Sequence, residues 1–166
     1  MILCAAAYSF DKTDTKSQWI NICSNMDHVL EYSTSLDVKP VSLIVLTWHE
    51  SRWRYGSRSE VGACGIAQVV PKYTRPRVSC RSLQDPEVGL LYGAKALRQW
   101  LNTTDNNLTR AYCHYNCGNE CFDQGLDYAR DVMRSYRRFN KIKRGIESLL
   151  ENIKLFALNS FTFINK

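Results

Sequence analysis

The residue best suited to acid–base chemistry is Glu50, at the C-terminal end of the most apolar segment of the chain. Leu46, Trp48 and Trp53 lie close to it in sequence. A carboxyl group held against an aromatic, water-poor surface has a raised pKa, because desolvation disfavours its charged form. A general acid must keep its proton near neutral pH, so this setting favours that role. The segment alone is equally compatible with a glutamate that ends a helix in solvent.

The cysteines offer a second kind of chemistry. There are seven, an odd number, so at least one thiol is unpaired within the chain. Cys113, His114, Cys117 and Cys121 suggest a zinc site, but no second ligand cluster supports it, and neighbouring side chains on a helix diverge by about 100°. In an oxidising compartment a disulfide between Cys113 and Cys121 is favoured over zinc. Cys64 and Cys80 are a second possible pair.

The elements that would position these residues are helices. Residues 1–16 are expected to form an irregular N-terminal segment. Apolar spacing predicts a helix over residues 17–36. Pro40 suits the first turn of the next helix, over residues 41–53. Periodicity cannot separate a buried helix from a buried strand there, but the Pro start and the length favour a helix.

The next segment, residues 55–71, is rich in glycine and predicts a loop that leads into a short helix near Ala67. The proline-marked segment 71–84 predicts another loop. Three more helices are expected: Pro86 to Leu101 with Asp85 as N-cap, Leu108 to Cys117 stopped by Gly118, and Leu126 to Phe139.

The C-terminal segment carries an amphipathic pattern. Its apolar positions fall at helical spacing, at Ile142, Ile146, Leu149, Leu150, Ile153 and Phe156. Charged residues occupy the opposite face. This helix either packs on the domain or serves as a membrane-surface or partner-binding helix. The chain therefore divides into an N-terminal segment (1–16), one helical domain (17–139) and a C-terminal helical extension (140–166).

Composition limits the function classes. Lys and Arg number 22 and Asp and Glu 16, a net charge of +6, which admits nucleic acid, anionic lipid or an acidic polymer as partners. No nucleic-acid motif accompanies the arginines, so we expect solvated charge around a binding face and no specific nucleic acid. No apolar run reaches the roughly 20 residues of a transmembrane helix. The apolar stretch 2–10 lacks a basic flank, which disfavours a signal peptide.

Five sequence blocks between residues 38 and 136 stand out in order along the chain. They are Glu50-Ser51-Arg52-Trp53, Gly62–Pro71, Asp85-Pro86 with Gly93–Leu97, Tyr115–Gly118 and Tyr128–Val132. Each is weak alone. Together they resemble the soluble lytic transglycosylases of the goose-type-lysozyme-like group, in a version with flanking cysteines that is similar to phage-encoded members.

The resemblance implies a mainly α, lysozyme-like fold and a peptidoglycan substrate, without cofactor or metal. It implies that Glu50 protonates the glycosidic oxygen between MurNAc and GlcNAc and then acts as base on the MurNAc 6-hydroxyl, closing a 1,6-anhydro ring. Ordinary glycosidases need two carboxylates. Here the substrate supplies the nucleophile, which explains why no second catalytic carboxylate is evident. The nearest rivals, Asp85 and Glu60, are interpreted as a helix cap and an exposed loop residue.

The resemblance also implies a set of substrate-binding residues: Ser51, Gly62, Gly65, Gln68, Tyr115, Asn116 and Gly118. Ser51 and Gln68 would position Glu50 or the N-acetyl group of the sugar. Tyr115 and Asn116 would line the cleft opposite, with the tyrosine hydroxyl able to hold the carboxyl group of Glu50. The glycines would let backbone approach the glycan closely or adopt φ > 0.

Two other functions remain open. One is a goose-type lysozyme that hydrolyses the same bond with water, and the other is a non-enzymatic wall-binding component of a virion or secretion channel. We expect action in the bacterial periplasm or cell wall. A short chain without a recognisable signal favours carriage in a phage virion and local wall opening for genome entry, with the C-terminal helix contacting other virion or secretion-channel proteins.

Overall fold

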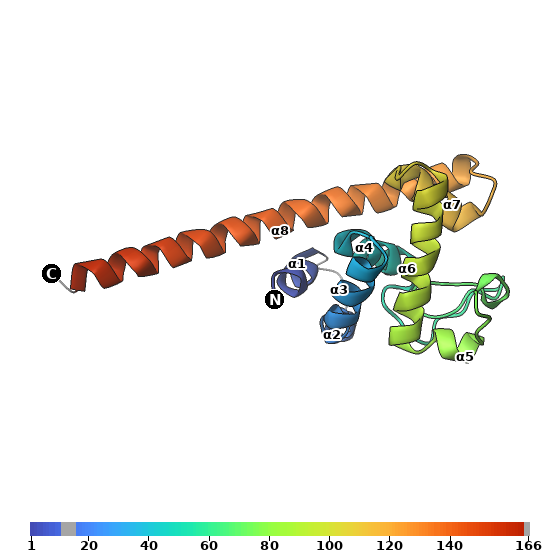
Figure 1. The fold of residues 1–166 in the computed structure, drawn as a ribbon, viewed down its shortest axis with the longest axis horizontal. Coiled ribbons are helices and arrows are strands. Elements are labelled where there is room, and N and C mark those ends of the chain that lie inside the picture. Colours follow the sequence, from blue (N-terminus) through green and yellow to red (C-terminus); the bar gives the residue numbers. More distant parts are fainter. Residues whose placement is uncertain (11–15, 165–166) are drawn as a thin grey trace.

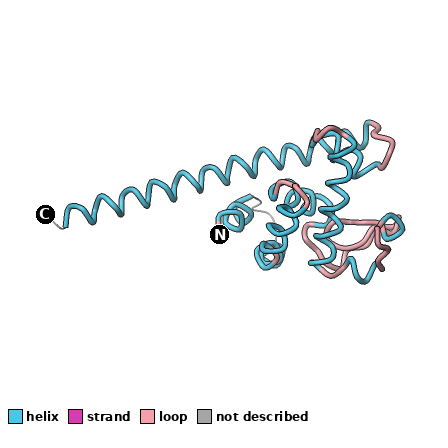
Figure 2. The backbone as a smooth tube through the Cα atoms, viewed as in Figure 1, coloured by secondary structure: helices cyan, strands magenta, loops and turns pink. Residues whose placement is uncertain are grey.

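The computed structural model describes residues 1–10 and 16–164, and it is mainly helical, as the sequence predicts (Figures 1 and 2). The helices in chain order are α1 (Ile2–Phe10), α2 (Lys16–Ser24), α3 (Met26–Ser35), α4 (Pro40–Ser51), the 3-10 helix η1 (Pro71–Tyr73), α5 (Cys80–Leu83), α6 (Pro86–Thr103), α7 (Leu108–Cys117) and α8 (Asp123–Ile164). Within the described residues, β-pairing is confined to isolated bridges at Arg58–Cys64 and Cys64–Val69.

Helix α4 forms the centre of the core. Every residue from Val41 to Trp48 is buried, and the helix contacts α3, α6 and α8. A helix that is apolar on all sides is stable only where neighbours cover it completely. The predicted helix is therefore confirmed, but it ends at Ser51, because Arg52 and Trp53 both adopt left-handed backbone with φ of 54° and 57°.

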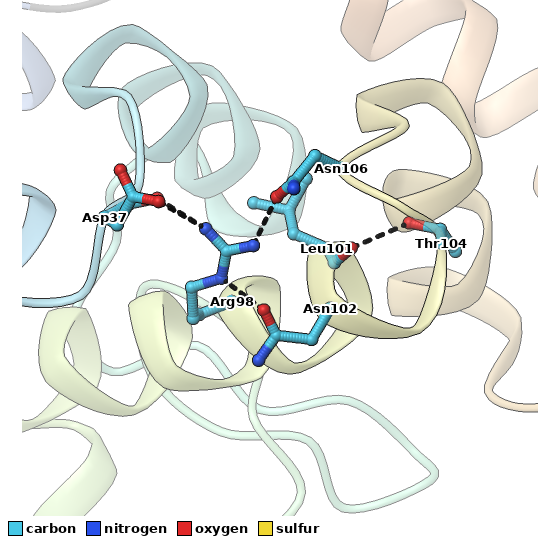
Figure 3. Close-up of polar contacts among 6 residues, drawn as sticks. All are labelled: Asp37, Arg98, Leu101, Asn102, Thr104 and Asn106. Atoms are coloured by element: carbon cyan, nitrogen blue, oxygen red, sulfur yellow. Dashed lines mark hydrogen bonds and ion pairs between the residues drawn. The ribbon is translucent and has the colours of Figure 1, made fainter.

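Arg98 of α6 joins the turn between α3 and α4 to the turn between α6 and α7 (Figure 3). Its Nη1 donates to the carbonyl oxygen of Asp37 at 2.8 Å and to its carboxylate at 3.1 Å. Its Nε donates to Asn102 at 2.9 Å, and its Nη2 donates to Asn106. Asp37 and Asn106 have φ of 51° and 59°, so one guanidinium fastens two left-handed turns.

Residues 52–84, between α4 and α6, form a region that we call the loop lobe. It has a small core of its own around Cys64, Val69 and Leu83, and the Cys64–Cys80 disulfide closes it. The short helix expected near Ala67 is wrong: Cys64 and Val69 exchange backbone hydrogen bonds and close a tight turn instead. The loop expected over 71–84 contains η1 and α5.

The N-terminal segment differs from the expected loose start. Residues 2–10 form α1, which contacts α2 and α8 and buries Ala6 and Ala7 completely, and Cys4 is bonded to Cys23. The single helix expected over 17–36 is two helices, separated at Asn25. The amide of Asn25 donates to the carbonyl of Asn21 at 2.8 Å and to Tyr55 at 2.8 Å, which draws the backbone out of the helix.

Helix α8 is longer than expected. It runs without a break from Asp123, so the boundary between residues 139 and 140 falls inside one helix. Phe139 is buried and Ile146 packs on the core, but Leu149 and Ile153 are 59% and 55% exposed. The amphipathic helix is therefore packed on the domain up to Ile146 and extends beyond it afterwards (Figure 1). Among the described residues, no helix is long and apolar enough to cross a membrane.

Candidate active site

Glu50 lies in the last turn of α4, where its carboxyl group is largely removed from water. Burial raises its pKa from 4.5 to about 7, and a hydrogen bond from Tyr128 opposes part of that rise. The Tyr128 hydroxyl donates to Oε1 of Glu50. A carboxyl group with this pKa carries a proton at neutral pH in a large fraction of molecules, as a general acid must.

Tyr128 reaches Glu50 from α8, and its position is set by contacts between α8 and α4. Its ring packs edge-on against His49, with ring centroids 6.2 Å apart. His49 Nε2 in turn lies 2.8 Å from Ser135 Oγ, about two turns further along α8. Burial and the charge of Glu50 raise the pKa of Tyr128 well above its usual value, so its hydroxyl remains a proton donor in the hydrogen bond.

Tyr115 lies near Glu50 but has a different partner. Its hydroxyl donates to the carbonyl oxygen of Ala67 at 2.7 Å. Burial raises its pKa well above the usual value, and the charge of Glu50 adds to the rise. In the structure it is Tyr128, and not Tyr115, that holds the carboxyl group, while Tyr115 ties α7 to the loop lobe.

Ser51 and Gln68 both fix the turn that faces the end of α4. Ser51 is buried, and its hydroxyl donates to the carbonyl oxygen of Ile66 at 2.8 Å. The Gln68 side-chain amide donates to the carbonyl oxygen of Gly65 at 2.9 Å, and Gln68 has a left-handed φ of 48°. Both side chains thus use a donor to hold backbone beside Glu50. Their expected contact with the sugar stays a prediction.

The glycines of the site serve different purposes. A Cβ at Gly65 would lie 1.8 Å from the carbonyl oxygen of Leu83, so this glycine lets the turn pack on α5. A Cβ at Gly62 would meet open space, which leaves that position free for an approaching ligand. Gly118 ends α7 with φ of 73°. Asn116 is exposed, and its side-chain oxygen accepts from the thiol of Cys117.

The rival carboxylates have the roles expected of them. Asp85 caps α6 by accepting from the backbone N–H groups of Glu87 and Val88 at 3.0 and 3.2 Å. Glu60 is exposed in the loop lobe. Within the part of the chain that the structure describes, no three His, Cys, Asp or Glu side chains gather to hold a metal ion. Glu50 is therefore the candidate acid of this arrangement.

The cysteines follow the proposed pairings. Cys113 is bonded to Cys121 and Cys64 to Cys80, which confirms both pairs, and Cys117 is free. The first bridge spans the turn between α7, with Tyr115, and α8, with Tyr128. It thereby links α7 to the loop residue two positions before α8 begins.

Sequence reasoning missed the role of Tyr128. The residue stood in the last of the five blocks, but nothing in its spacing from Glu50 says that two positions 78 residues apart meet. The sequence does carry a weak signal, since Tyr128 falls on the same helical face as the buried Val132.

Comparison with known proteins shows the family of the chain. Residues 27–136 match the family described as "Transglycosylase SLT domain". The chain belongs to this family, which confirms the resemblance to the soluble lytic transglycosylases.

A solved structure supports the fold. It is an inactive mutant of the lytic transglycosylase Slt from Pseudomonas aeruginosa, with a TM-score of 0.63 and 19% sequence identity. The match covers 69% of this chain and 24% of the other, so the chain corresponds to about a quarter of that protein.

Proposed function

We propose that this protein cleaves the β-1,4 bond between MurNAc and GlcNAc in peptidoglycan and leaves a 1,6-anhydro-MurNAc end. The observation that carries the proposal is one half-buried acid: Glu50 has a pKa of about 7 and a tyrosine donor on its carboxyl group. The second-carboxylate candidates Asp85 and Glu60 are, respectively, a helix cap and an exposed loop residue. One acid without a carboxylate partner suits a reaction whose nucleophile belongs to the substrate.

The reaction then has two proton transfers through one residue. Protonated Glu50 gives its proton to the glycosidic oxygen as the bond from that oxygen to C1 of MurNAc breaks. The resulting carboxylate takes the proton of the C6 hydroxyl, whose oxygen forms the new bond to C1, and Glu50 is protonated again. Tyr128 donates to the carboxyl group, and this bond strengthens when negative charge appears on it. Tyr128 therefore stabilises Glu50 in its basic state.

The test is digestion of purified sacculi by wild type and Glu50→Gln, with zymography and mass spectrometry of the products. We expect clearing by wild type only, and anhydro ends among its products. Reducing MurNAc ends would instead identify a hydrolase on the same fold. Equal clearing by Glu50→Gln would contradict the assignment of Glu50, and binding without any clearing would identify a non-enzymatic wall-binding component.

The biological setting is a further part of the proposal. A large assembly cannot pass an intact peptidoglycan mesh, so a phage particle that carries this enzyme could open the wall locally for genome entry. Conjugation and secretion systems face the same barrier. The exposed apolar side chains Leu149, Leu150 and Ile153 suit α8 to contact with other proteins of such an assembly. Mass spectrometry of purified virions tests this setting, and absence of the protein from them would exclude carriage by the virion.

A further inference from the structure

The net charge of the protein is concentrated in one region. The loop lobe, residues 52–84, contains seven basic residues and one acidic residue, a net charge of +6. The rest of the chain contains fifteen basic and fifteen acidic residues and is neutral overall. The charge of the whole chain is also +6, so the lobe accounts for all of it.

The basic residues of the lobe are all exposed: Arg52, Arg54, Arg58, Lys72, Arg75, Arg77 and Arg81. Their placement follows from the fold, because the interior of the lobe is small and apolar and a disulfide closes it. Several cations elsewhere have an acid beside them. On α8, for example, Arg134 contacts Asp131 at 2.8 Å, and Lys143 contacts Glu147 at 2.7 Å. The lobe offers its cations only Glu60 within its own sequence.

The lobe is fastened directly to the candidate active site. It begins two residues after Glu50, and Ser51 donates to its Ile66 carbonyl at 2.8 Å. From the other side, Tyr115 donates to its Ala67 carbonyl at 2.7 Å. A ligand held by the lobe would therefore be held at a fixed position relative to Glu50.

We propose that the basic lobe binds the carboxylates of the peptide stems that project from the glycan strand, and so holds the strand at Glu50. This inference rests on the proposed function. Guanidinium groups pair with carboxylates through two parallel hydrogen bonds, and a cluster of exposed cations also attracts an acidic polymer before contact. Nucleic acid carries negative charge too, but only stems lie on the same strand as the bond that Glu50 would cut.

The test compares two triple variants that lose the same charge, each in the Glu50→Gln background so that the substrate stays intact. The lobe variant replaces exposed arginines of the lobe: Arg58→Gln, Arg77→Gln and Arg81→Gln. The control variant replaces exposed cations of α8: Lys141→Gln, Arg144→Gln and Lys154→Gln. Binding is measured by sedimentation with purified sacculi, and again with sacculi whose carboxylates have been converted to neutral amides.

We expect the lobe variant to bind native sacculi about tenfold more weakly than Glu50→Gln at low salt, since each exposed charge contributes modestly and the contributions add. The control variant should bind within about twofold of Glu50→Gln. Amidated sacculi should bind all three proteins equally weakly. At about 0.5 M salt the difference on native sacculi should shrink, because screening acts within a few ångströms.

Three results would overturn the proposal. One is an equal loss of binding in the lobe and control variants, which would indicate net charge alone. Another is an undiminished difference on amidated sacculi. The third is a lobe variant that loses affinity for duplex DNA or anionic vesicles but not for sacculi. If circular dichroism shows that the lobe variant does not fold, the deciding measurement is the binding of Glu50→Gln to native sacculi compared with its binding to amidated sacculi. Because binding is measured without cleavage, a wild type that fails to cut sacculi would refute the proposed function and leave this result standing.

Discussion

Replacing Glu50 with glutamine should stabilise the folded protein while removing its activity, and the gain should depend on pH. The carboxyl group has a pKa of about 7 in the folded chain against an ordinary value of 4.5. Below pH 4.5 the group is protonated in both states and burial has little cost. Between these two values the unfolded chain ionises while the folded chain keeps its proton, so stability falls as pH rises. Above about pH 7 the loss is complete.

The size of the effect follows from the shift. A difference of about 2.5 pKa units between 4.5 and about 7 corresponds to about 3 kcal/mol at 1.36 kcal/mol per unit. Glutamine has nearly the same shape, accepts the hydrogen bond from Tyr128 and does not ionise. The variant should therefore gain about 3 kcal/mol relative to wild type between pH 4 and pH 8, or roughly 6–12 °C in melting temperature for a chain of this size.

The assay is thermal unfolding of both proteins at pH 4 and pH 8, without reductant so that the disulfides stay intact. Glu60→Gln, at an exposed glutamate of the loop lobe, is the matched control and should show no pH-dependent gain. An advantage of Glu50→Gln that is the same at both pH values would refute the reasoning, because it would mean that the carboxyl group is not held in a water-poor site.

Further substitutions test the supports of the site. Tyr128→Phe should lower the cleavage rate by about tenfold and move the alkaline fall of the pH–rate profile to higher pH. The reason is that the hydrogen bond from Tyr128 favours the charged form of Glu50, so its loss raises the pKa of Glu50. Tyr115→Phe should leave the alkaline fall in place, and equal shifts in the two variants would contradict the geometry. Gly65→Ala should cost more than about 3 kcal/mol in the free energy of unfolding measured with urea, whereas Gly62→Ala, also at positive φ but facing open space, should cost about 1 kcal/mol. Titration of the native protein with a thiol reagent should find one reactive thiol per chain, and a count of three or more would contradict the disulfides.

Much of the fold follows from local sequence signals. Asp85 and Pro86 open α6, Asn107 caps α7 and Gly118 ends it, because these residues satisfy helix termini wherever they occur. Short-range chemistry of this kind does not depend on the rest of the chain. The structure differs from the sequence-based prediction where packing between helices overrides these local signals. Residues 2–10 are helical because Ala6 and Ala7 are buried, and α8 continues past residue 139 because Ile142 and Ile146 pack on the core.

The acid itself was also predictable from sequence, since Glu50 ends an apolar helix and is followed by the other blocks of its family. What tertiary structure decided is the environment that raises the pKa of Glu50. Tyr128 donates to Glu50 from α8, and Tyr115, expected to do so, donates to Ala67 instead. Which of two tyrosines reaches a carboxyl group depends on how three helices pack. A sequence records the spacing of residues along the chain, and only packing sets the distances between them.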